Sequence, residues 1–169
     1  LDGAAPAPPI NISSTEKERL DYVNLLEPVY QGVFKTVFSS MELAIDIESE
    51  TKTIIGEDGN EIKIYISKPK DMSEDIPAII HLHGGGMAIL SANDTNYIYW
   101  RNKLASKGLV VLGVEFRNIG GAQGNHPFPA GLNDCISALK WVYENKKELG
   151  ISKIILSGES GGGNLSIAT

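Results

Sequence analysis

One serine stands in a setting that is typical of a catalytic nucleophile. Residues 158–162 read Gly-Glu-Ser-Gly-Gly, with an apolar segment before them at 154–156 and a helix-compatible segment after them at 164–168. The pattern G-x-S-x-G between a strand and a helix predicts a tight, strained turn that lifts the Ser160 hydroxyl above a sheet edge. Small residues two before and two after the serine avoid collisions there, and the N-terminus of the next helix points at developing negative charge. A glycine-rich turn for phosphate is the alternative, but the Lys followed by Ser or Thr of a phosphate loop does not occur here.

A second glycine cluster could complete the same chemistry. Residues 83–86 read His-Gly-Gly-Gly, directly after an apolar segment at 78–82. Three successive glycines let backbone N–H groups turn inward without side-chain obstruction. An oxyanion hole needs this arrangement to hold the oxygen that becomes negative in a tetrahedral intermediate. By itself the cluster also fits a plain tight turn, but next to the serine motif it favours a hydrolase that forms an acyl-enzyme.

The segments around these motifs alternate between strands and helices. Residues 78–82, 109–114 and 154–156 are short, continuous and apolar, as expected for strands with both faces covered. Helical patterns lie between them, one over 94–107 and one from about residue 132 to Gly150. This order predicts a parallel α/β sheet.

The pattern upstream is different. Alternation around 45–47 and 62–66 predicts an antiparallel pair of strands. Two amphipathic helices are expected before it, one from about Ser13 to Pro28 and one over 30–41. Residues 1–12, with three prolines, are expected to be an extended lead-in.

Taken together, the motifs resemble the α/β-hydrolase carboxylesterases of the hormone-sensitive-lipase family. The resemblance is dense from about residue 78 onward and weak before residue 43. It is carried by His83-Gly84-Gly85-Gly86-Met87, Glu115-Phe116-Arg117-Asn118, His126-Pro127-Phe128-Pro129, Asp134-Cys135 and residues 158–169. It implies an α/β-hydrolase fold, with a mostly parallel central sheet flanked by helices and an N-terminal helical cap, of which this chain is about the first half. Residues 1–42 would be the N-terminal extension and cap helices, and residues 43–169 the N-terminal half of the hydrolase core.

The resemblance also implies roles for single residues. Ser160 would be the nucleophile, and the N–H groups of Gly85, Gly86 and Gly161 would be the oxyanion donors. Met87 is expected to line the substrate pocket. No metal and no organic cofactor is implied.

The chain departs from the family at two points. Most members have Asp before the serine and Ala after it, where this chain has Glu159 and Gly161, and the loop 118–125 is longer and richer in glycine than usual. Both departures leave the chemistry intact and concern substrate preference. Tyr97 and Trp100 fit either the substrate pocket or ordinary packing.

The other members of a catalytic triad are not identified in this sequence. In this fold the order along the chain is Ser, then Asp or Glu, then His, and neither an acid nor a histidine follows Ser160. His81, His83 and His126 are interpreted as structural. The predicted function is a serine carboxylesterase that hydrolyses small-molecule esters, with the triad acid and histidine supplied by a C-terminal segment or a second chain. Two alternatives stay open: a receptor-like member that binds a small molecule without hydrolysis, as gibberellin receptors do, and an amidase or peptidase of the same fold.

Composition argues against several other classes. The 15 Lys and Arg against 21 Asp and Glu give a net charge of −6, which argues against binding to nucleic acid. No apolar run approaches the roughly 20 residues that a membrane helix needs. The single cysteine, Cys135, excludes a disulfide within the chain and a Cys-based zinc cluster. With no recognisable signal peptide, these features predict a cytoplasmic protein.

Overall fold

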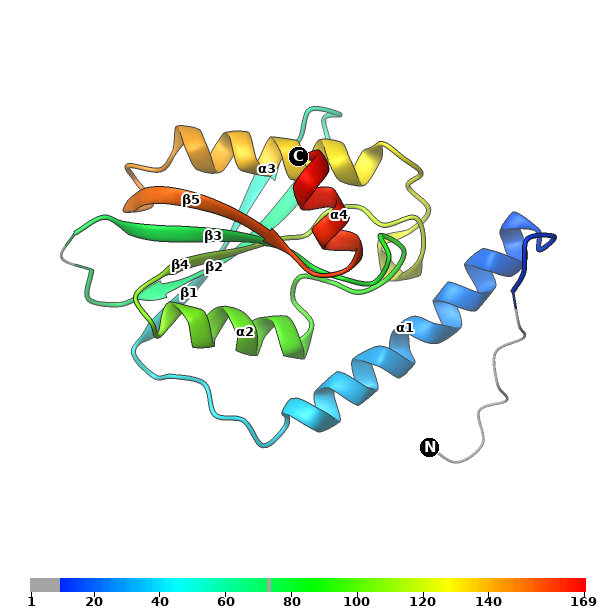
Figure 1. The fold of residues 1–169 in the computed structure, drawn as a ribbon, viewed down its shortest axis with the longest axis horizontal. Coiled ribbons are helices and arrows are strands. Elements are labelled where there is room, and N and C mark those ends of the chain that lie inside the picture. The colour runs from blue at the N-terminus through cyan, green and yellow to red at the C-terminus, as the bar shows by residue number, and fades with distance from the viewer. Residues whose placement is uncertain (1–9, 73) are drawn as a thin grey trace.

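Five strands form one mixed sheet in the computed structural model, which describes residues 10–72 and 74–169 (Figure 1). The strands are β1 (Ile47–Ile55), β2 (Glu61–Pro69), β3 (Ile76–Leu82), β4 (Val110–Val114) and β5 (Ile151–Gly158). Their order across the sheet is β1-β2-β4-β3-β5. β2 runs antiparallel to β1 and β4, whereas β3 runs parallel to β4 and β5. The C-terminal ends of β3 and β5 therefore lie side by side, and the two glycine motifs follow those ends.

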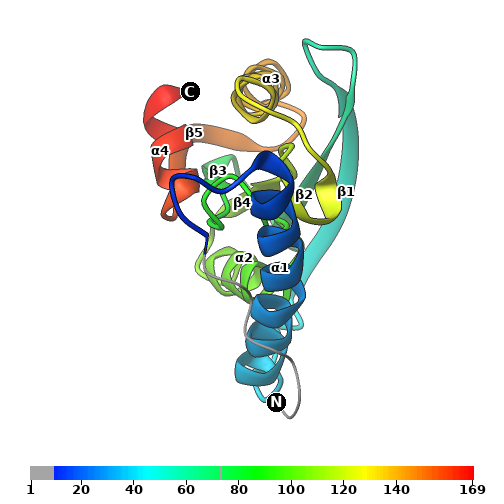
Figure 2. The same ribbon diagram turned by 90° about the vertical axis from the view of Figure 1, so that its right-hand side faces the viewer.

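Helices cover both faces of this sheet. They are α1 (Glu16–Phe38), α2 (Thr95–Ala105), α3 (Ala130–Glu144) and α4 (Gly161–Ala168), with a short 3₁₀ turn, η1 (Gly121–Gln123). α3 and α4 lie on one face and α2 on the other, while α1 packs outside α2 and against η1 (Figures 1 and 2). None of the described helices is long and apolar enough to cross a membrane.

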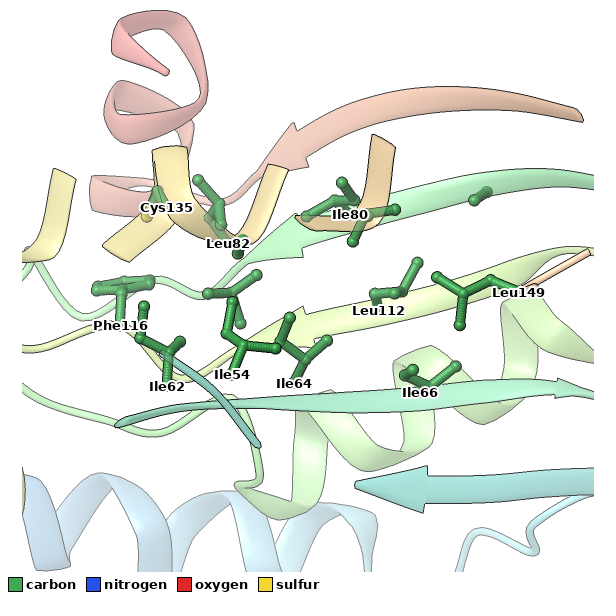
Figure 3. Close-up of a cluster of buried hydrophobic side chains, with 14 of the residues drawn as sticks. Ile54, Ile62, Ile64, Ile66, Ile80, Leu82, Leu112, Phe116, Cys135 and Leu149 are labelled. Atoms are coloured by element: carbon green, nitrogen blue, oxygen red, sulfur yellow. The ribbon is translucent and has the colours of Figure 1, made fainter. Parts of the chain in front are cut away.

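The hydrophobic core lies between the sheet and α3. All five residues of β4 are buried, which is why its sequence is continuously apolar. Figure 3 shows the side chains of β2, β3 and β4 meeting Cys135 of α3 and Phe116, which follows β4. Packing in this core fixes how β3 is aligned along β4, and therefore where the loop after β3 begins.

The structure confirms the predicted parallel strands and the presence of an antiparallel pair, but the first strand of that pair begins at Ile47 and runs to Ile55, mostly beyond residues 45–47, where it was expected. The expectation of two N-terminal helices is wrong, because α1 is one helix that continues through Pro28. It also begins later than expected, at Glu16, with Thr15 and Glu18 forming the capping box. Residues 1–9 of the expected extension lie outside the described residues. The expected division at residue 42 falls in the segment between α1 and β1 and stays a prediction.

Candidate active site

Ser160 lies in a strained turn between β5 and α4. Its φ of 51° and ψ of −115° belong to a region that side chains rarely adopt. A Cβ atom on Gly158 would lie 2.1 Å from the carbonyl oxygen of Gly162, and a Cβ atom on Gly162 would lie 2.0 Å from that of Leu82. Only glycine fits either position, so these two residues make the turn possible. The Ser160 side chain does not cap α4, which leaves its hydroxyl available to a substrate.

The loop after β3 approaches this turn closely. Gly85 and Gly86 have φ values of +96° and +65°, a backbone region that favours glycine. A Cβ atom on Gly161 would lie only 2.9 Å from the Cα of Gly86 and from the nitrogen of Met87. The first residue of α4 thus touches the loop backbone directly.

The N–H groups of this region divide into two sets. Gly84 donates to the Tyr97 hydroxyl at 2.8 Å, and Gly162 donates to the Glu159 carbonyl at 2.8 Å. By contrast, the N–H groups of Gly85, Gly86 and Gly161 find no acceptor within the part of the chain that the structure describes. Three unengaged donors around one serine are suited to stabilise an oxyanion.

One cavity of about 400 Å³ joins the serine to the loop after β3. Ser160, Gly85 and Gly86 line it together with Glu159 and residues 88–90. The opposite wall comes from α1, through Val23, Leu26, Tyr30 and Phe34. The sequence places these four residues in the predicted cap helices but gives none of them an individual role at the site. Their helical spacing indicates a role in packing, because the apolar face of an amphipathic helix is normally buried against another part of the protein.

Comparisons with known proteins show which family the chain resembles in sequence and in fold. The BD-FAE family model matches residues 63–169, more than half of the chain. Carboxylesterase NlhH of Mycobacterium tuberculosis is 34% identical over 128 residues, which cover 74% of this chain and 38% of that protein. Brefeldin A esterase, a bacterial homologue of human hormone-sensitive lipase, superposes with a TM-score of 0.79 and 40% identity over 99% of this chain and 46% of its own. The structure of esterase Est22 gives a TM-score of 0.76 and 38% identity over 92% of this chain and 46% of its own.

The chain belongs to the hormone-sensitive-lipase family of α/β-hydrolase carboxylesterases. The predicted family and fold class are therefore confirmed. The chain spans less than half the length of these relatives.

Two side chains that the sequence suggests for the substrate pocket, Met87 and Trp100, lie away from the cavity at Ser160. Met87 does not line the cavity at Ser160, because it packs against the hydrophobic core and borders a separate cavity of about 50 Å³ near Phe116. Trp100 packs against the ring of His81 at a centroid distance of 4.0 Å.

Tyr97 instead supports the loop after β3. Its side chain is buried, and its hydroxyl accepts the Gly84 N–H bond and donates to Oε1 of Glu159 at 3.4 Å. Burial raises the pKa of Tyr97 to about 12, so the hydroxyl keeps its proton at neutral pH. Glu159 thereby connects the serine turn to the loop after β3 through Tyr97.

The three histidines have partners away from Ser160, and none of them lines its cavity. The ring of His83 stacks on Phe116 at 4.1 Å, and its Nδ1 donates to the Gly84 carbonyl at 2.8 Å. His81 lies 3.5 Å from the Ser157 hydroxyl, and Nε2 of His126 donates to the Gln123 carbonyl at 2.8 Å. Burial lowers the pKa values of His81 and His83 to about 4. Within residues 10–72 and 74–169, no group of three or more His, Cys, Asp or Glu is arranged to hold a metal ion.

Proposed function

We propose that this chain supplies the nucleophile and the oxyanion donors of a serine carboxylesterase. The observation that carries the proposal is the juxtaposition, on one cavity, of a serine in a strained turn with unengaged N–H groups of the glycine loop. The Ser160 hydroxyl oxygen would attack the ester carbonyl carbon while its proton passes to a base. The N–H groups of Gly85, Gly86 and Gly161 would stabilise the negative oxygen. Collapse of the intermediate releases the alcohol, and water then attacks the acyl-enzyme to release the acid.

The base and the acid that orients it are proposed to come from a segment outside these 169 residues, either later in the same polypeptide or in a second chain. Two observations support this proposal. All three histidines of the chain are engaged away from the cavity. The relatives, moreover, are more than twice as long as the matched region.

The proposed substrate is a small carboxylic ester with an apolar group. The wall that α1 contributes is aliphatic and aromatic, and a cavity of about 400 Å³ has room for a small molecule. The negative net charge speaks against a nucleic-acid partner. A cytoplasmic location is proposed from cysteine usage alone, because the one cysteine, Cys135, is a buried free thiol.

Substitution of the serine tests the function. In the complete protein, Ser160→Ala is expected to abolish hydrolysis of short-chain p-nitrophenyl esters, because loss of a nucleophile typically costs on the order of a million-fold in kcat. Ser166→Ala is the matched control, since the Ser166 hydroxyl bonds the Gly162 carbonyl within α4. A Ser160→Ala variant that kept more than a small fraction of the wild-type kcat would show that another residue is the nucleophile, because the oxyanion donors alone leave only a small residual rate.

A receptor-like protein that binds without hydrolysis is the second candidate. The absence of a histidine from the described lining of the cavity is the observation that favours it. A fluorophosphonate probe separates the two, because only an activated serine reacts rapidly. Rapid labelling of Ser160 in the complete protein supports the esterase, and ligand binding without labelling supports the receptor. Comparison of ester and anilide substrates then separates an esterase from an amidase.

A further inference from the structure

We propose that Glu27 of α1 is a positioning residue for the oxyanion loop, defined here as residues 83–90. Its carboxylate holds the far end of this loop and thereby makes the rate of the reaction depend on the docking of α1. The inference rests on the proposed esterase function and adds to it a residue that contacts neither the ester nor Ser160.

Glu27 is a buried carboxylate whose two oxygens are both used. The residue is 5% exposed. Its Oε1 accepts the N–H of Leu90 at 2.7 Å, and its Oε2 accepts the N–H of Ala122 at 2.6 Å. Among the residues that the structure describes, it forms no ion pair. The negative charge is therefore met by two backbone N–H groups from separate loops, and hydrogen bonds of this kind are stronger than those to a neutral acceptor.

The neighbouring backbone is shaped to admit this carboxylate. A Cβ atom on Gly121 would lie 2.6 Å from Oε2 of Glu27, and Gly121 has a φ of +66°. A side chain at position 121 would push the carboxylate away from the N–H of Ala122. The glycine-rich loop that sets this chain apart from its family thus serves in part to receive Glu27.

The oxyanion loop needs an external restraint at Leu90. Met87 and Leu90 have φ values of 62° and 75°, in addition to the positive values at Gly85 and Gly86. A non-glycine residue in this region is strained, and it persists only where its surroundings impose it. Leu90 is fixed on both sides, since its N–H bonds Glu27 and its carbonyl accepts from Asn118 at 2.8 Å. Removing the carboxylate frees one of these two restraints.

Helix α1 has other attachments that keep it docked when this one is lost. One turn before Glu27, Oδ1 of Asn24 accepts the N–H of Gly121 at 3.0 Å. One turn after it, Nε2 of Gln31 donates to Oδ1 of Asp94 at 3.0 Å. Neither bond touches the oxyanion loop. A change at Glu27 should therefore alter the loop rather than remove the apolar wall of the cavity.

Kinetics of Glu27→Gln in the complete enzyme test the proposal. Glutamine has nearly the same shape, but it is neutral and has one acceptor oxygen, so the bond to Leu90 is either lost or reduced to a weaker bond to an uncharged oxygen. We expect kcat to fall about ten- to a hundredfold for p-nitrophenyl acetate, butyrate and octanoate alike, because small displacements of preorganised donors cost rates of this order. KM should stay nearly constant, and labelling of Ser160 by a fluorophosphonate should slow by a similar factor.

Glu16→Gln is the matched control, because Glu16 lies on the same helix and makes only an exposed bond to Asn125. It should remain within about twofold of the wild type, as expected for a surface substitution. If Glu27→Gln does not fold, Glu27→Asp replaces it under the same criteria, since aspartate keeps the charge but is too short to reach both loops.

Three results would overturn the proposal. The first is an unchanged kcat in a folded Glu27 variant, and the second is an equal loss in Glu16→Gln. The third is a rise in KM that grows with acyl length, because this pattern would mean that Glu27 only keeps the apolar wall in place. Ester hydrolysis that is retained in the Ser160→Ala variant would instead refute the proposed function. The failure of this proposal and the failure of the proposed function are therefore distinguishable.

Discussion

His83 shows how a single residue can serve the site without joining the reaction. The ring is fully buried, stacked on Phe116, and its Nδ1 donates to the Gly84 carbonyl. These contacts fix the first residue of the glycine loop and leave the following N–H groups free. Burial keeps this ring neutral, because it penalises the imidazolium and lowers the pKa of His83 to about 4.

The buried histidine predicts a pH dependence of stability. As the pH falls below 6.5, the unfolded chain takes up a proton on this ring, whereas the folded protein does not until about pH 4. The free energy of unfolding should therefore be intact above pH 6.5 and decrease toward pH 4, by about 3 kcal/mol for this group. Denaturant titrations at several pH values measure the decrease, and carbon NMR of labelled histidine identifies the group. A His83 resonance that titrates near pH 6.5 in the folded protein would contradict the argument.

At the scale of elements, an ion-pair network centred on Arg117 connects the segment after β4 with α3 and with the turn between β1 and β2. Asp134 of α3 is 1% exposed and accepts bonds from Nε and Nη2 of Arg117 at 2.9 and 2.8 Å. It also accepts the backbone N–H of Arg117 at 2.8 Å and Nδ2 of Asn60 at 3.0 Å. Arg117 also forms an ion pair with Asp58, which lies in the turn between β1 and β2. The carboxylate thus connects the segment after β4 to a helix and to a hairpin.

Asp134→Ala is expected to destabilise the protein by roughly 3 kcal/mol, because it removes a buried acceptor of four hydrogen bonds and leaves buried donors without a partner, although Arg117 keeps its pair with Asp58. Lys140→Ala is the comparison, since Lys140 and Glu57 form an exposed pair at 3.6 Å. Such a surface pair contributes about 0–1 kcal/mol. Chemical denaturation of the two variants measures the difference. Equal losses of stability would mean that the network at Asp134 adds nothing beyond an ordinary surface contact.

The elements differ in how far the sequence predicts them. Buried strands and the glycine before the serine are predictable because their requirements are local: β4 needs apolar residues on both faces, and Gly158 is imposed by the backbone of Gly162 in the same turn. Gly162 follows from the motif, but the backbone that it meets belongs to Leu82, at the end of a distant strand. The continuity of α1 is not predictable in this way. Pro28 favours a break in the helix. However, hydrogen bonds from Glu27 to Leu90 and from Gln31 to Asp94, one on each side of the proline, attach both parts of α1 to segments that are distant in the sequence.

Long-range pairing explains the other differences. Glu27 accepts hydrogen bonds from residues 63 and 95 positions away in the sequence, and a local sequence pattern cannot predict such partners. Met87 follows the glycine motif, but its positive φ turns the chain so that the side chain enters the core instead of the cavity at Ser160. The residues of α1 that line the cavity were predicted to form an apolar face, but what that face covers depends on the tertiary fold.

At the scale of the whole molecule, the apolar surface is unevenly distributed. In the part of the chain that the structure describes, β5 pairs with β3 alone and forms one edge of the sheet. Ile155 on this strand is 52% exposed, and Tyr143 of α3 and Ile167 of α4 are 64% and 91% exposed. An exposed apolar strand edge is a site for association with other chains. The unpaired edge of β5 marks the place where the proposed further segment would pack.

The last prediction concerns these 169 residues produced by themselves. With the β5 edge exposed, they should associate and bind a hydrophobic dye such as ANS, in contrast to the complete protein. They should also fail to hydrolyse p-nitrophenyl esters, because no histidine lines the cavity at Ser160 to take its proton. Analytical ultracentrifugation, dye fluorescence and an esterase assay on both proteins make the comparison. Co-expression with the remainder of the protein should restore a monodisperse, active species if the remainder supplies the acid and the base. A soluble, cooperatively unfolding monomer of residues 1–169 that cleaves esters unaided would refute both the open edge and the missing base.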